Sequence, residues 1–263
     1  MRLGGVHITM AYLASIGKLY GDGGLFDILT ESDVYAEGTA RQLLQGKQLA
    51  RGIRSIKLAS EALFRLFWNA MQPWLEKKGK CAITGAQEQL LRDVQHACHG
   101  NDKATAQQPI GEVETELTGI QNIIKTFIVE GAKQSATFGY WLMFLKGADL
   151  LLRILRSERE ADFQLHLNSM CEVIPWFRAA GRTNYAKYMP VYVAEMNALE
   201  HEQPEAYTFM QEGEFVVRRS EDHSFNCVAL ATDQALEQTI NREARVRVEL
   251  LASHCERQLS QDG

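Results

Sequence analysis

The sequence is poor in proline and has no closely spaced cysteine pair. Five prolines is a low count, and together with 46% hydrophobic residues it excludes a disordered chain and indicates one that buries a core. The cysteines are odd in number, lie far apart and form no C-x-x-C, which is typical of reduced thiols in a cytosolic or nuclear protein. They are Cys81, Cys98, Cys171, Cys227 and Cys255.

An excess of basic residues is also lacking, as are long apolar runs. The formal net charge is −5, so the global signature of a nucleic-acid-binding protein is absent, although a local basic patch stays open. The first residues do not resemble a signal peptide. The most apolar stretch, 138–155, contains Lys146, Asp149 and Arg153, which predicts a buried helix and no membrane partner. We therefore expect an intracellular protein, nuclear or cytoplasmic.

Several common catalytic motifs are missing. The chain contains no G-x-G-x-x-G, no G-x-x-x-x-G-K-[ST], no G-x-S-x-G and no H-E-x-x-H. These absences argue against the common kinases, dehydrogenases, hydrolases and zinc peptidases.

Apolar residues recur every three to four positions along most of the chain, which predicts helices. We expect a mainly α fold, an irregular multi-helix bundle in a single domain over 1–263, with helices over 161–179 and 184–199 among others. One or two short strands are expected near 3–7 and 214–218. The polar stretch 100–110, with its glycine and proline, is expected to be an exposed loop.

Basic residues cluster between 41 and 57, where no acidic residue occurs between Gly38 and Ser60. A basic helix face can bind phosphates, and it can equally be a solvated side of the helix. The candidate DNA-binding residues are Arg41, Lys47, Arg51, Arg54, Lys57, Arg182, Arg218 and Arg219.

Asp233 and Glu237 stand four residues apart at the start of an expected long helix. Paired carboxylates can hold Mg²⁺, whereas an acidic residue at a helix N-terminus is also an ordinary cap. His7 follows two glycines, where it can serve as a ligand or base or be a hydrogen-bonded core residue. Asp162 and His166 share a helical face, as a metal pair or as a local contact.

Three stretches together carry a resemblance: RLGGVHITMAYLASIGKLYGDGGL (2–25), RTNYAKYMPVYVAEMNALE (182–200) and FVVRRSEDHSFNCVALATDQALEQTINREA (215–244). In this order they resemble a group of mobile-element-derived proteins with a transposase-like region of the ribonuclease H type. The resemblance ends near Ala244, and the tail 245–263 does not match it.

The resemblance implies two-metal phosphoryl transfer on DNA, with Mg²⁺ as the cofactor. It places Glu237 and Asp233 as catalytic and metal-binding residues on a late helix, and His7 in the G-x-x-H position. The strand that carries the first catalytic acid in such proteins is not matched here. We therefore expect a transposase-like C-terminal fragment that lacks nuclease activity alone and binds DNA. The alternatives are a non-catalytic helical scaffold with protein partners and a Mg²⁺-dependent nuclease.

Overall fold

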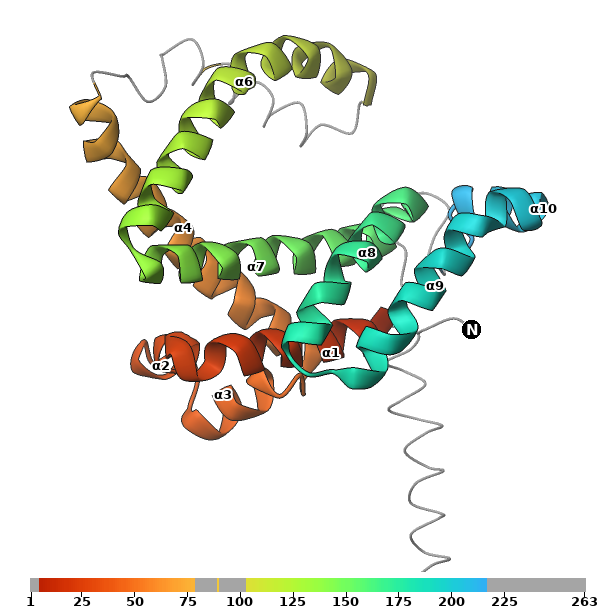
Figure 1. The fold of residues 1–263 in the computed structure, drawn as a ribbon, viewed down its shortest axis with the longest axis horizontal. Helices are drawn as coiled ribbons and strands as arrows, with labels where there is room; N and C mark the ends of the chain where they lie inside the picture. Colours follow the sequence, from red (N-terminus) through yellow and green to blue (C-terminus); the bar gives the residue numbers. More distant parts are fainter. Residues whose placement is uncertain (1–4, 79–88, 90–102, 217–263) are drawn as a thin grey trace, which may run out of the picture. The chain divides into compact units, whose positions relative to one another are not determined.

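The computed structural model describes residues 5–78, 89 and 103–216, and in these ranges the chain is helical with no strand. The mainly α prediction is confirmed (Figure 1). The elements are α1 (Gly5–Tyr20), the segment η1 (Gly21–Leu25), which is kinked at Gly24, α2 (Phe26–Glu31), α3 (Glu37–Leu44), α4 (Leu49–Lys77), α6 (Lys103–Gln134), α7 (Ala136–Glu160), α8 (Phe163–Ala179), α9 (Thr183–Glu202) and α10 (Pro204–Gln211).

The strand prediction is wrong at both ends of the described chain. Residues 5–7 begin α1, because Val6 is buried in register with Thr9, Leu13 and Ile16 at helical spacing. Residues 214–216 form a turn after Gly213, whose φ of 86° ends α10. The apolar character of this stretch has another cause, since Phe215 and Val216 pack in a buried cluster with Phe163 and Leu167.

The loop prediction for 100–110 is wrong from Lys103 onward, where α6 begins. The alanine, lysine and glutamine residues of this stretch have high intrinsic helix propensity, which outweighs the single Pro109 near the start of the helix.

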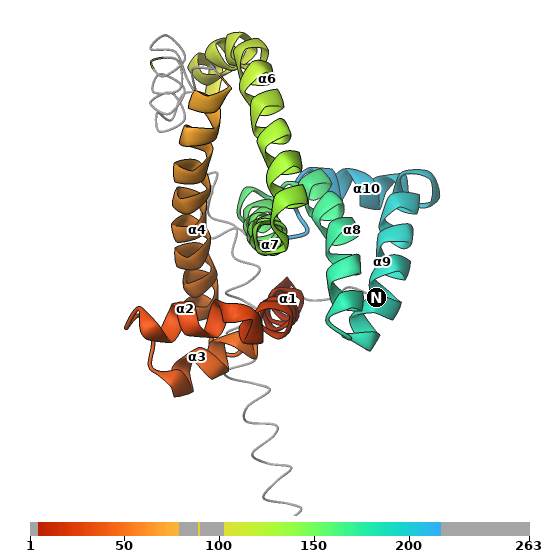
Figure 2. The same cartoon turned by 60° about the vertical axis from the view of Figure 1, so that its left-hand side comes forward.

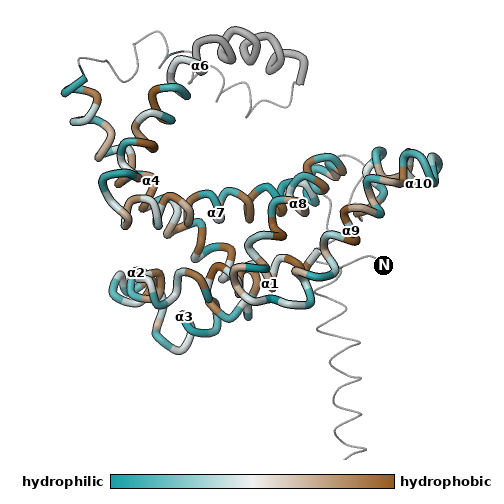
Figure 3. The backbone as a smooth tube through the Cα atoms, viewed as in Figure 1, coloured by the Kyte–Doolittle hydropathy of each residue, from teal (hydrophilic) through white to brown (hydrophobic). Residues whose placement is uncertain are grey.

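The helices form two compact units. Unit 1 comprises Met1–Ala59 and Gly147–Gly263, and unit 2 comprises Ser60–Lys146. Figure 3 shows hydrophobic residues recurring between hydrophilic ones along the helices, as in helices that bury one face. The expectation of a single domain over 1–263 stays a prediction. None of the described helices is both long enough and apolar enough to cross a membrane.

Tyr12 of α1 lies at the centre of unit 1. Its side chain is fully buried, and its hydroxyl donates a hydrogen bond to the Gly147 carbonyl at 2.9 Å. The ring meets those of Trp176 and Phe177 edge-on at 5.9 and 6.3 Å. Burial raises the pKa of the Tyr12 hydroxyl far above its usual value, so it stays a neutral donor that ties α1 to α7 and α8.

Helices α8 and α9 run side by side in unit 1 (Figures 1 and 2). Asp162 caps the start of α8, because its carboxylate accepts from the Leu165 backbone N–H at 2.8 Å. The chain then turns through Gly181, whose φ is 67°, directly into α9. This turn sets the first residues of α9 beside α1, where Tyr185 donates to the His7 carbonyl at 3.4 Å.

Helices α1 and α3 approach each other so closely that their backbones touch. A Cβ on Gly17 would lie 1.9 Å from the Leu44 carbonyl oxygen, and one on Gly46 would lie 2.3 Å from the Met10 carbonyl oxygen. Gly46 also has a φ of 76°, which reverses the chain after α3. This crossing brings α3 and the chain turn after it against one side of α1 (Figure 2).

Unit 2 has its own small core. Met71 and Leu75 of α4 are buried against Phe127 of α6, and the rings of Phe67 and Trp74 from α4 and of Phe138 from α7 pack around them. At the rim, Glu130 accepts hydrogen bonds from Trp74 Nε1 at 2.9 Å and Lys78 Nζ at 3.0 Å. These bonds lower the pKa of the Glu130 carboxyl group.

The ion pair between Arg153 of α7 and Glu172 of α8 predicts a pH effect on stability. Arg153 donates two hydrogen bonds to Glu172, at 2.6 and 2.7 Å, and these lower the pKa of Glu172 from 4.5. Because the folded pKa is the lower one, the stabilisation is complete above pH 4.5 and disappears as pH falls through the folded pKa.

We expect Glu172→Gln to lower the free energy of unfolding at pH 7 by no more than about 1 kcal/mol, because the Glu172 side chain is 52% exposed and solvent screens the pair. The difference between the two proteins should shrink as the pH falls toward 3. Urea unfolding of both proteins at several pH values measures it. A difference that is constant over this range would contradict the assignment.

Candidate phosphate-binding site

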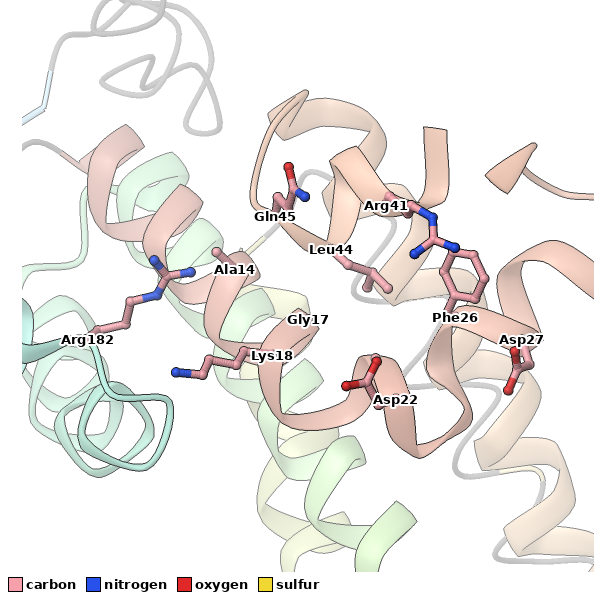
Figure 4. Close-up of a pocket in the computed structure, with 11 residues that line it drawn as sticks. Ala14, Gly17, Lys18, Asp22, Phe26, Asp27, Arg41, Leu44, Gln45 and Arg182 are labelled. Atoms are coloured by element: carbon pink, nitrogen blue, oxygen red, sulfur yellow. The ribbon is translucent and has the colours of Figure 1, made fainter. Parts of the chain in front are cut away.

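A hollow of about 730 Å³ opens in unit 1 between α1, η1, α2, α3 and the start of α9 (Figure 4). Three small residues of α1 and η1, Ala14, Gly17 and Gly21, line part of its wall. Its charged lining residues are Lys18, Arg41, Arg182, Asp22 and Asp27. Three elements distant in sequence therefore bring cations to one concave surface.

Lys18 and Arg182 form the most basic end of the hollow. The Lys18 ammonium nitrogen lies 3.2 Å from the point where a side chain on Gly181 would begin, which sets it against the turn that carries Arg182. The Nε of Arg182 is buried and has no hydrogen-bond partner among the described residues. No carboxylate of the described chain pairs with either cation, so their charges are available to an anion.

The N-terminus of α9 adds to this positive end. Arg182 is its N-cap residue and makes no capping hydrogen bond with its side chain, and the first turn contains no acidic residue. The first backbone N–H groups of a helix have no partner within the helix, and the helix dipole favours an anion there. The start of α8 differs, because Asp162 already fills that role.

Arg41 occupies another part of the hollow. Its guanidinium lies over the Phe26 ring, 4.8 Å from the centroid, and its distance to the Glu37 carboxylate is 3.8 Å with both side chains exposed. Such an ion pair is weak in water. The other contact of this guanidinium is the cation–π contact with the Phe26 ring.

The predicted basic run is divided by the structure. Arg41 lies in α3 and lines the hollow, whereas Lys47 precedes α4 and follows the glycine turn. Arg51, Arg54 and Lys57 are exposed on consecutive turns of α4. Arg51 hydrogen-bonds the neutral Gln48 side chain at 3.2 Å. The exposure of Arg51, Arg54 and Lys57 is compatible with phosphate binding and with a solvated side of the helix, so both alternatives from the sequence analysis stay open.

His7 lies on α1 with its side chain exposed, and its carbonyl accepts the hydrogen bond from Tyr185. Close backbone approach is found two residues earlier, because a Cβ on Gly5 would meet the buried Glu158 carboxylate at 1.9 Å. The other residues of the transposase-like hypothesis, Asp233 and Glu237, lie outside the described residues, as do Arg218 and Arg219. Their convergence with His7 stays a prediction.

Among the described residues, no group of three or more His, Cys, Asp or Glu side chains is placed so that it could hold a metal ion. Asp162 caps α8, while His166 Nε2 is hydrogen-bonded to Tyr192 at 3.1 Å. The two side chains of this sequence pair are thus directed to different partners.

Lys18 is the basic residue that sequence reasoning missed. It stands near the end of an apolar helix that also holds no acidic residue, so no charge cluster in the sequence marks it. A signal exists in the glycine-rich segment that follows it, Gly21–Leu25, because small residues there leave space beside the helix.

No curated protein and no solved structure matches this chain. A family model matches residues 1–258, nearly the whole length. The chain therefore belongs to the family described as domain of unknown function (DUF8702).

Proposed function

We propose that this protein is a mobile-element-derived, transposase-like protein that binds DNA through its phosphate backbone and does not cleave DNA as an isolated chain. The observation that carries the DNA-binding part is the exposure of Arg51, Arg54 and Lys57 on one helix of unit 1, in a segment that contains no acidic residue. A duplex offers a row of phosphates, and exposed cations on successive helical turns match such a row.

The origin part of the proposal rests on the three ordered sequence blocks that resemble transposase-like proteins. The lack of nuclease activity is proposed because the sequence blocks that carry the resemblance match only two carboxylates of that pattern. Two metal ions need carboxylates from several positions, and Asp233 with Glu237 supplies only one such pair.

Reversal of charge on α4 tests the proposal. We expect Arg51→Glu with Arg54→Glu to lower the affinity for a 20-base-pair duplex at least about tenfold at low salt. Each phosphate contact contributes about 0.9 to the slope of log K against the logarithm of the salt concentration. The loss of two contacts should therefore reduce the magnitude of this slope by about 2. Fluorescence anisotropy of a labelled duplex at several salt concentrations measures both quantities.

The matched control is Lys125→Glu with Lys146→Glu, two exposed lysines of unit 2 whose reversal changes the net charge equally. This control should keep the slope and most of the affinity. The scaffold alternative predicts a different result, namely no duplex binding at low salt or an equal loss in both double variants.

A further inference from the structure

We propose that the hollow of unit 1 is a nucleotide-binding site, in which Lys18 and Arg182 hold a phosphate monoester and the Arg41–Phe26 pair supports the base. This inference goes beyond backbone binding by α4 and does not depend on it. Figure 4 shows Lys18 and Arg182 at one end of the hollow and the stacked Arg41 and Phe26 toward the other.

The basic end fits a dianion. Two cations, Lys18 and Arg182, are brought together around Gly181 with no described carboxylate to pair with them, and like charges so placed repel until an anion binds. Arg182 Nε is a buried donor without a described acceptor, and the uncapped start of α9 adds its partial positive charge. A phosphate monoester carries up to two negative charges and several acceptor oxygens, which matches this set better than a singly charged phosphodiester does.

The stacked pair fits a base. The Arg41 guanidinium is held by the Phe26 ring at 4.8 Å and lines the hollow. Arginine planes and aromatic rings are the surfaces on which proteins stack bases, and such stacking is worth about 1–3 kcal/mol per base.

The two carboxylates of the hollow limit the ligand to one phosphate group. Asp22 lies between the two ends in Figure 4, and Asp27 lines the hollow near Phe26. A carboxylate accepts hydrogen bonds from sugar hydroxyls or base amino groups but repels a second phosphate. The volume of about 730 Å³ falls in the range of small-ligand sites. We therefore expect a nucleoside triphosphate to bind no more tightly than the monophosphate.

Calorimetric titration of the full chain with adenosine 5′-monophosphate tests the proposal. We expect saturable binding that weakens at least about tenfold in Lys18→Gln and in Arg182→Gln, since each removes one charged contact. Lys187→Gln is the matched control, because Lys187 is an exposed cation of α9 that lies over Tyr188 and does not line the hollow. Circular dichroism verifies that each variant is folded.

Further titrations show whether the phosphate is needed for binding and whether the ligand is a free nucleotide or the end of a nucleic-acid strand. Adenosine should not bind, because it lacks the phosphate. If a trinucleotide with a 5′-phosphate binds better than the same trinucleotide with a 5′-hydroxyl, the natural ligand is the end of a nucleic-acid strand. If only the monophosphate binds, the natural ligand is a free nucleotide. Both results support the proposal. The Arg51→Glu, Arg54→Glu protein should keep its affinity for the monophosphate, which distinguishes this site from DNA binding by α4.

Two results would overturn the proposal. One is the absence of monophosphate binding at millimolar concentration. The other is equal affinity in wild type, Lys18→Gln and Arg182→Gln, which would show that any binding takes place elsewhere.

Discussion

Replacement of Gly17 by alanine should destabilise unit 1 by about 3 kcal/mol or more. The new Cβ would lie 1.9 Å from the Leu44 carbonyl oxygen and 2.6 Å from the Leu44 carbonyl carbon. Both are backbone atoms, so no side-chain rotation relieves the overlap and α1 must separate from α3. Thermal unfolding followed by circular dichroism measures the loss.

Gly38→Ala is the matched control, because Gly38 lies in α3 and a Cβ there would meet nothing within 4 Å. Alanine is favoured over glycine in a helix by up to about 1 kcal/mol, so this variant should be as stable as wild type or slightly more stable. Equal melting temperatures for Gly17→Ala and Gly38→Ala would show that α1 and α3 are not in backbone contact.

Gly46→Ala should have an effect of similar size for two combined reasons. Its Cβ would lie 2.3 Å from the Met10 carbonyl oxygen, and the residue has a left-handed φ of 76°, which costs a non-glycine residue roughly 1 kcal/mol. We expect a loss of about 3 kcal/mol or more in urea unfolding.

The same turn offers the opposite substitution as a control. Gln48 already has a φ of 58°, so Gln48→Gly should be neutral or stabilising by up to about 1 kcal/mol. If Gln48→Gly and Gly46→Ala destabilised the protein to the same extent, the assigned backbone conformation of this turn would be wrong.

The helices were predictable because their signal is local. Apolar spacing over 161–179 and 184–199 predicted α8 and α9 to within a few residues at each end. Short apolar runs carry less information, since Phe215 and Val216 pack equally well from a turn as from a strand. The helix at 103–110 was missed because a polar stretch that contains Pro109 is also typical of a loop, although its alanine, lysine and glutamine residues favour a helix.

The candidate site was predictable only in part. Arg41 and Arg182 were identified as basic residues, but 141 positions separate them (182 − 41), and no periodic pattern indicates that both line one hollow. Lys18 was missed because it stands alone on an apolar helix. The hollow results from tertiary contacts, namely the α1–α3 crossing and the turn into α9 through Gly181.

One native gel with a labelled duplex, the full chain and Mg²⁺ tests both DNA binding and the lack of cleavage. We expect a retarded complex from which DNA of unchanged length is recovered, and we expect the Arg51→Glu, Arg54→Glu protein to form no such complex. Duplex that migrates freely at low salt would contradict DNA binding, and shortened DNA that depends on Mg²⁺ and on Glu237 would show that the chain is a nuclease.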